Sequence, residues 1–240
     1  MAMDTSPLLD LNSLSVDELA NFYKAPESTW VRSNMAISLD GHYVDDAGSS
    51  RGLSSSLDVS ILLLLRALSD VVVVGGFTAR QEAYAPALPR PEFAHLSASP
   101  PRLCVLSRTL DFDVNDAMFQ QDVSLPIIIT SETREAIWED RCAALHSVSE
   151  MIVLSELTGR SVINVLTEMK LKSVVSEGGP FLQQLLRADQ VINELDVTIA
   201  PVIAGTTSGT SPFGSFAGTV SPRAVARGGD HIYARFFVDS

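Results

Sequence analysis

The chain has 240 residues, and 46% of them are hydrophobic, which is enough for one large domain with its own core. Its 29 acidic and 17 basic residues give a formal net charge of −12, which argues against nucleic acid or an anionic membrane as a partner. The two cysteines are isolated, so we expect no disulfide, no metal site and a reducing cytoplasm. No apolar run approaches the roughly 18 residues of a membrane-spanning helix, and the N-terminus lacks a signal-peptide pattern.

The first 28 residues carry only short structural signals. Ser15 and Glu18 have the spacing of a capping box at the start of a helix, and Pro26 ends that helix. We expect residues 1–28 to form an N-terminal extension that packs on the domain or on a neighbouring chain. Residues 29–240 would then form one domain.

The main domain opens with a weakly alternating run over residues 30–41 that ends in Asp40 and Gly41. This pattern predicts a strand entering a turn, with residues 42–44 as the returning strand. A loop rich in Ser and Gly follows, and apolar residues at helical spacing from 56 to 68 then predict a helix that carries Arg66. An arginine on an otherwise apolar surface must reach an edge or an anion.

A run of valines over residues 71–74 predicts a buried strand that ends in Gly75 and Gly76, with Thr78 shortly after. Beyond it, prolines are dense between residues 86 and 101. Because proline fixes its backbone and lacks an N–H, we expect an ordered surface loop or a lid there, without regular structure.

Two further predicted strands, over residues 103–108 and 126–131, end in polar residues. Ser107 and Arg108 end the first strand. The serine either caps a turn or, together with the arginine, binds the extra phosphate that distinguishes NADP from NAD. Thr130 lies at the end of the second strand and is a candidate for a further cofactor contact.

The strand predicted over residues 172–175 leads into a second pair of glycines, in the segment Glu177-Gly178-Gly179-Pro180. Glycines let a backbone approach a ligand closely, Pro180 suits the first position of a helix, and the free amides that follow carry the positive end of the helix dipole. The segment predicts a turn that binds a pyrophosphate, with Glu177 facing the reacting molecule. Many α/β proteins contain such a turn, but the earlier copy at Gly75 suggests two walls of one cleft.

The remaining elements alternate between strand and helix. We expect helices over residues 132–140 and 158–169, strands over 149–153 and 193–205, and a final antiparallel strand over 232–238. Repeated β-α units favour a mostly parallel sheet with helices on both faces. The sequence therefore predicts an α/β domain with a mostly parallel sheet and an antiparallel C-terminal region.

Markers of several enzyme classes are absent from the sequence. It contains no G-x-G-x-x-G, no P-loop, no G-x-S-x-G elbow and no H-E-x-x-H motif. The four histidines lie far apart in the chain. With catalytic nucleophiles and metals unsupported, we expect the chemistry to belong to a bound cofactor.

In their order and spacing, the motifs resemble the reductase domain of riboflavin biosynthesis, the pyrimidine reductase family, which is similar in fold to dihydrofolate reductase. The resemblance spans about residue 30 to the C-terminus and rests on residues 37–41, 65–67 with Asp70, 74–78, 176–180, and Pro201 with Gly205. It implies an NADPH-dependent reductase of 5-amino-6-(5-phosphoribosylamino)uracil that opens the ribose to a ribityl chain. It also implies a homodimer.

The resemblance further implies which residues bind. With the glycine turns and Thr130 included, the expected cofactor-binding residues are Ala36, Gly75, Gly76, Thr78, Ser107, Arg108, Thr130, Gly178, Gly179, Pro180, Phe181 and Leu182. The expected substrate-binding residues are Ser50, Arg66, Glu82, Arg90 and Glu177. Hydride would reach C1 of the sugar, and Asp40 or Glu177 would supply a proton or stabilise the cation.

The chain departs from the riboflavin reductases on the substrate side. Residues 50–52 read Ser-Arg-Gly where the family usually has Ser-x-Trp, and the spacing from Glu82 to Arg90 differs from the family's Asp-Asn-Pro segment. No zinc deaminase half with H-x-E and P-C-x-x-C precedes the domain, so we do not expect a bifunctional enzyme. Two alternatives stay open: a reductase of a dihydrofolate-like or pterin-like compound, and a nucleotide-binding module without catalysis.

Overall fold

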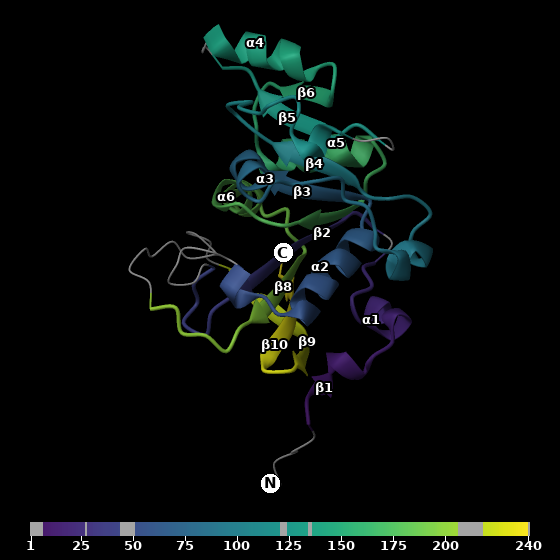
Figure 1. The fold of residues 1–240 in the computed structure, drawn as a ribbon. Helices are drawn as coiled ribbons and strands as arrows, with labels where there is room; N and C mark the ends of the chain where they lie inside the picture. The colour runs from purple at the N-terminus through teal and green to yellow at the C-terminus, as the bar shows by residue number, and fades with distance from the viewer. Residues whose placement is uncertain are drawn as a thin grey trace.

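The computed structural model describes residues 7–26, 28–43, 51–120, 124–133, 136–205 and 218–239. Its strands join into one sheet with the order β1-β9-β10-β8-β2-β7-β3-β4-β5-β6, which runs from one end of the molecule to the other (Figure 1). The strands are β1 Leu9–Asp10, β2 Trp30–Ile37, β3 Val71–Gly75, β4 Arg102–Leu106, β5 Ile127–Ser131, β6 Glu150–Leu154, β7 Ser173–Ser176, β8 Glu194–Ile199, β9 Val220–Gly228 and β10 His231–Val238. The helices are α1 Val16–Phe22, α2 Ser56–Ala67, α3 Gly76–Gln81, α4 Ala136–Leu145, α5 Gly159–Glu168 and α6 Pro180–Ala188.

The sheet is mostly parallel, as the β-α order predicts. All pairings from β8 through β2, β7, β3, β4 and β5 to β6 are parallel, whereas β10 pairs antiparallel with both β8 and β9. The chain moves outward from β3 to β6 and then returns with β7 to a place between β2 and β3. In open sheets of this kind, ligands bind outside the carboxyl ends of the strands where the order reverses. That point lies at the ends of β3 and β7.

Helices cover both faces of the sheet. Leu19 of α1, Ile61 of α2 and Trp138 of α4 belong to the core on one face, and Val162 of α5 and Leu186 of α6 belong to the core on the other. The valines of β3 divide between these two cores and are fully buried. This burial on both sides explains why β3 reads as a continuous apolar run and not as an alternating one. No helix in the described ranges has both the length and the apolar character needed to cross a bilayer.

Several elements differ from the sequence-based expectations. Helix α3 was not predicted, and Pro91–Leu96 in the proline-dense stretch form a 3-10 helix. Residues 42 and 43 form no strand, although the Ser38 N–H donates to the His42 carbonyl at 2.7 Å, and Val44 lies outside the described residues. The helix expected over 132–140 is α4, which begins at Ala136, and the strand expected to reach residue 205 ends at Ile199. Strand β9 was not predicted. Most of its side chains are exposed, so it lacks the apolar alternation that reveals a half-buried strand.

A buried charge cluster fastens α1 to the sheet. Arg32 donates to the Tyr23 carbonyl at 2.8 Å, and Arg235 donates to the Phe22 carbonyl, so two guanidinium groups cap the C-terminal end of α1. Glu194 pairs with both arginines, at 3.1 and 2.5 Å, and its side chain is fully buried. Helix α1 packs on the core of the domain. The boundary between an N-terminal extension and the domain at residue 28 stays a prediction.

Asp196 completes the cluster but is held less firmly than Glu194. Its oxygens lie 3.4 Å from Arg32 Nε and 3.5 Å from Arg235 Nε, and neither oxygen makes a hydrogen bond within the described structure. Burial therefore outweighs the attraction of the two arginines, and the nearby Glu194 adds repulsion, so the pKa of Asp196 is raised to about 7. Tyr23 also lies close enough to interact electrostatically with Asp196 and Arg235.

Asp196→Asn tests this pKa. A carboxyl whose pKa is higher in the folded state holds extra protons there, so wild-type stability falls as the pH rises from about 4 to about 7. The amide cannot ionise, so its stability lacks this dependence on pH. We expect the unfolding free energy of the variant, relative to that of the wild type, to increase by on the order of 1–3 kcal/mol as the pH rises from 5 to 8. Urea denaturation across that range measures the difference. Parallel pH curves for the two proteins would contradict the raised pKa.

Candidate active site at the two glycine turns

The two glycine turns lie side by side at the carboxyl ends of β3 and β7. The Gly75 N–H donates to the Gly178 carbonyl at 3.2 Å, and the Glu177 N–H donates to the Val73 carbonyl at 3.1 Å. Gly178 and Gly179 have φ angles of +100° and +93°, which L residues with a side chain rarely adopt. The two predicted walls are therefore one connected structure, because β3 and β7 are direct neighbours in the sheet.

The second turn has the backbone features of an anion site. Helix α6 begins directly after Gly179, and Gln183 makes the first intrahelical bond, to the Gly179 carbonyl. The amides of Phe181 and Leu182 precede that bond, so they belong to the unpaired first turn of the helix. No described atom lies within 4 Å of the position that a Cβ on Gly178 would occupy. Open backbone and helix amides together fit a diphosphate. The Leu182 side chain is buried in the core, so this residue could contribute only its backbone.

Gly179 and Gly76 serve packing. A Cβ on Gly179 would lie 2.7 Å from Thr78 Oγ1, so the missing side chain lets α3 approach the second turn. A Cβ on Gly76 would lie 3.0 Å from both Phe112 and the Ser107 Cβ. The predicted cofactor contact at Gly76 is therefore not favoured, because the side from which a ligand would approach is filled by protein.

Arg108 lies beside the second turn, and its guanidinium group stacks over the Phe181 ring at 4.5 Å. It is exposed, so its charge is accessible to a ligand at the turn. Ser107 is buried, and its hydroxyl accepts the Leu110 N–H at 3.0 Å, which is the turn-capping alternative. Thr130 is fully buried and accepts a long hydrogen bond from the Trp138 indole at 3.5 Å. Its predicted cofactor contact is not favoured, because its side chain packs under α4.

Glu177 is locked in a cluster that the sequence only partly indicated. Arg66 binds it through two hydrogen bonds, Nε to Oε1 at 2.5 Å and Nη2 to Oε2 at 2.7 Å. Tyr84, which was not predicted, donates its hydroxyl to Oε2 at 2.7 Å and lies under the Arg66 guanidinium at 5.4 Å. Burial alone would lower the pKa of Arg66, but the hydrogen bonds and charge of Glu177 raise it above its ordinary value. Arg66 therefore stays charged.

The contacts within this cluster limit the chemical role of the Glu177 carboxylate. Its side chain is 2% exposed, and both oxygens accept hydrogen bonds from a cation or a hydroxyl. The geometry of this carboxylate suits a role in orienting Arg66. Burial and the charge of Glu177 raise the pKa of Tyr84 well above its ordinary value, so Tyr84 remains a protonated donor.

Asp40, the other predicted proton source, accepts hydrogen bonds from the backbone of another segment. It accepts hydrogen bonds from the Ser38 hydroxyl at 2.6 Å, the Ala204 N–H at 3.0 Å and the Gly205 N–H at 2.8 Å. These bonds, led by the one from Ser38, hold the pKa of Asp40 far below its usual range. Asp40 therefore stays ionised and ties the turn after β2 to the segment after β8, which does not favour it as an acid.

The other predicted substrate residues do not gather at Glu177. The Glu82 side chain is exposed. Arg90 is about half exposed and lies 3.8 Å from Glu92. Ala36 lies near the end of β2, opposite Thr198 of β8. Ser50 falls outside the described residues.

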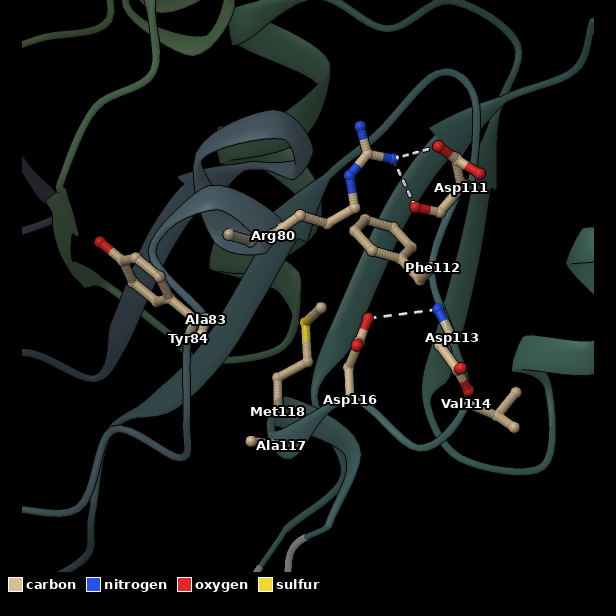
Figure 2. A pocket seen from close by; sticks show the side chains of 11 residues that line it. Arg80, Ala83, Tyr84, Asp111, Phe112, Asp113, Val114, Asp116, Ala117 and Met118 are labelled. Carbon is tan, nitrogen blue, oxygen red and sulfur yellow. Dashed lines mark hydrogen bonds and ion pairs between the residues drawn. The ribbon is translucent and has the colours of Figure 1, made fainter. Parts of the chain in front are cut away.

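A cavity of about 690 Å³ lies between α3 and residues 111–118, apart from the glycine turns (Figure 2). The Arg80 guanidinium, paired with Asp111 at 2.7 Å, and the Phe112 ring lie along one side of it. Tyr84 contributes to its wall, and the Tyr84 hydroxyl is directed away from the cavity. Volume alone does not identify a site, and the residues suited to a diphosphate lie at the turns. Among the described residues, no group of three or more His, Cys, Asp or Glu side chains is placed to hold a metal ion.

Alanine substitutions in the second turn separate backbone strain from collision. Gly178→Ala places a methyl group in open space at a positive φ, so we expect a loss of about 1–2 kcal/mol in unfolding free energy. Gly179→Ala adds a collision with Thr78 Oγ1 to a similar strain, so its loss should be larger. Thr78→Ala should recover part of the loss in the Gly179→Ala background. Denaturant titration measures all three, and equal losses in the two single glycine variants would contradict the packing described.

Comparison with known proteins agrees with this architecture. The model of the RibD C-terminal domain matches residues 29–221. The riboflavin biosynthesis protein RibD of Synechocystis sp. is 27% identical over 179 residues, which cover 75% of this chain and 47% of that protein. The chain thus spans about half the length of that curated relative.

Two solved structures share the fold. A pyrimidine reductase-like protein from Corynebacterium diphtheriae has a TM-score of 0.84 at 24% identity, with 95% of this chain and all of that one covered. A diaminohydroxyphosphoribosylaminopyrimidine deaminase/5-amino-6-(5-phosphoribosylamino)uracil reductase from Thermotoga maritima has a TM-score of 0.68 at 18% identity, with 92% and 60% covered. The fold is that of the dihydrofolate reductase-like reductases, and the chain belongs to the RibD C-terminal domain family.

Proposed function

We propose that the protein is an NADPH-dependent reductase of a phosphoribosylaminopyrimidine, of the 5-amino-6-(5-phosphoribosylamino)uracil type. The observation that carries this proposal is the joined pair of glycine turns, whose open Gly178 backbone lies at the N-terminus of α6. Family membership supports the reductase class and riboflavin biosynthesis as its setting. The use of NADPH and the identity of this substrate are proposed beyond that class.

The residues present suit the cofactor. The Gly178 backbone and the first amides of α6 would hold the pyrophosphate, and Thr78 supports the turn from α3. Arg108, exposed and stacked on Phe181, is placed for the adenosine phosphate that distinguishes NADPH from NADH. When bound, NADPH supplies a hydride. Bound at these turns, it would share the carboxyl edge of β7 with Glu177, the residue that directly follows that strand.

On the substrate side, the chain's own groups orient the substrate and do not transfer protons to it. Glu177 holds Arg66 by two bonds from Nε and Nη2, so that within the described part of the chain Nη1 of the guanidinium group is left to donate to a substrate oxygen. Asp40 stays ionised in the arrangement described, and both oxygens of Glu177 are engaged by Arg66 and Tyr84. The proton that accompanies hydride transfer to the sugar imine would then come from water.

A second candidate is a reductase of a dihydrofolate-like or pterin-like compound. The specific observation in its favour is that Glu177 compensates the charge of Arg66, while Arg90 lies at the surface next to Glu92. Among the described residues, the predicted substrate side thus offers little uncompensated positive charge to a phosphate. The homodimer remains a prediction.

The test is to titrate the purified protein with NADPH and NADH, add 5-amino-6-(5-phosphoribosylamino)uracil and follow the absorbance of the reduced nicotinamide. We expect tighter binding of NADPH and its oxidation upon substrate addition. Oxidation with dihydrofolate but not with the aminouracil would favour the second candidate. Binding without oxidation of either would indicate a nucleotide-binding module, and absence of binding would refute the proposal.

Arg108→Ala sharpens the cofactor assignment. Removing a cation from a phosphate should weaken NADPH binding about ten- to a hundredfold, since charge-assisted hydrogen bonds contribute roughly 1.5–3 kcal/mol, and should leave NADH binding unchanged. Arg160→Ala is the matched control, because Arg160 is an exposed arginine on α5 that bonds to Asp189. Equal weakening of both nucleotides by Arg108→Ala would contradict the phosphate contact.

A further inference from the structure

The segment in which this chain departs from the riboflavin reductases brings a new residue to the site. Of residues 82–90, the side chain that reaches Glu177 is that of Tyr84, whereas Glu82 and Arg90 are exposed. The local backbone conformation determines that the Tyr84 side chain points toward Glu177. The Tyr84 N–H donates to the Ala79 carbonyl at 2.9 Å, and Ala83 before it has a φ of +47°, so the chain turns sharply at the end of α3 and directs the tyrosine inward.

Tyr84 completes the hydrogen bonding of the ion pair. Glu177 Oε1 accepts from Arg66 Nε, and Oε2 accepts from both Arg66 Nη2 and the Tyr84 hydroxyl. The Tyr84 ring also lies against the guanidinium group at 5.4 Å, which restricts rotation of the arginine. The three side chains come from α2, the segment after α3 and the end of β7, so the tyrosine joins elements that the sheet alone does not connect.

We propose that Tyr84 is a specificity-determining positioning residue, which fixes Glu177 and Arg66 so that the guanidinium group offers one nitrogen to an uncharged oxygen of the substrate. The inference rests on the proposed function. The cluster has no net charge, because Glu177 compensates Arg66 and the tyrosine is neutral. A neutral donor site of this kind suits a carbonyl or hydroxyl oxygen better than a phosphate monoester, which attracts uncompensated cations.

A hydroxyl is suited to this position. A second acid there would repel Glu177, and a second base would compete with Arg66 for the carboxylate. Tyrosine satisfies the remaining lone pair of Oε2 without adding charge, and an unsatisfied buried carboxylate oxygen is costly. Phenylalanine in its place would keep the ring on Arg66 and remove only the hydrogen bond. Tyr84→Phe is therefore a narrow change that isolates the hydroxyl.

The experiment compares steady-state kinetics of the wild type, Tyr84→Phe and Tyr233→Phe with NADPH and 5-amino-6-(5-phosphoribosylamino)uracil. Tyr233→Phe is the matched control, because it removes another buried tyrosine hydroxyl, 3.0 Å from Ser55 Oγ, on β10. For Tyr84→Phe we expect the KM of the aminouracil to rise about tenfold, with kcat and the Kd of NADPH changed less than twofold. The control should leave all three near wild-type values.

The split between KM and kcat separates positioning from stability. A purely structural loss lowers the fraction of active protein, which reduces kcat and leaves KM unchanged. A Tyr84→Phe variant with an unchanged KM for the aminouracil, in an active wild type, would overturn the role of Tyr84 and leave the proposed function standing. A wild type that binds NADPH without turning over the aminouracil would overturn the proposed function and this inference together.

Discussion

The site depends on the direct contact between the turns after β3 and β7. That contact is possible because β7 returns to the middle of the sheet beside β3, and because Gly179 has no side chain. The Gly75 N–H is used in the bond to Gly178, and Thr78 fills the space beside Gly179. The glycines therefore have two different roles. Gly76 and Gly179 permit close packing, and Gly178 leaves its backbone open.

Much of the fold follows from sequence periodicity. The apolar run of β3 and the polar residues after it predict a buried strand with a turn at its carboxyl end, and the repeated β-α order predicts the parallel sheet. Strand β9 was missed because its side chains are mostly exposed and its sequence contains Pro222 and Arg223. It forms a hairpin with β10 through the two residues Gly229 and Asp230, so the glycine-rich turn is the local signal that could have indicated it.

The site was predictable in its backbone and less so in its side chains. The pairing of Arg66 with Glu177 agrees with the expectation that an arginine on an apolar helix must reach an anion. Tyr84 was missed because its role depends on a positive φ at Ala83 and on the approach of three separate elements. Ser107, Thr130 and Asp40 lie at or near the carboxyl ends of strands, as ligand-binding residues often do, but their polar atoms are used within the protein. Their predicted roles are therefore not favoured.

The central claim is that the joined glycine turns bind the diphosphate of the cofactor. It is tested most directly by backbone amide chemical shifts of the labelled protein during titration with NADPH. We predict saturable shifts at Gly178, Gly179, Phe181 and Leu182, with little change at residues 111–118. Shifts concentrated at residues 111–118 and at α3 would place the nucleotide in the cavity of Figure 2 and would contradict the account.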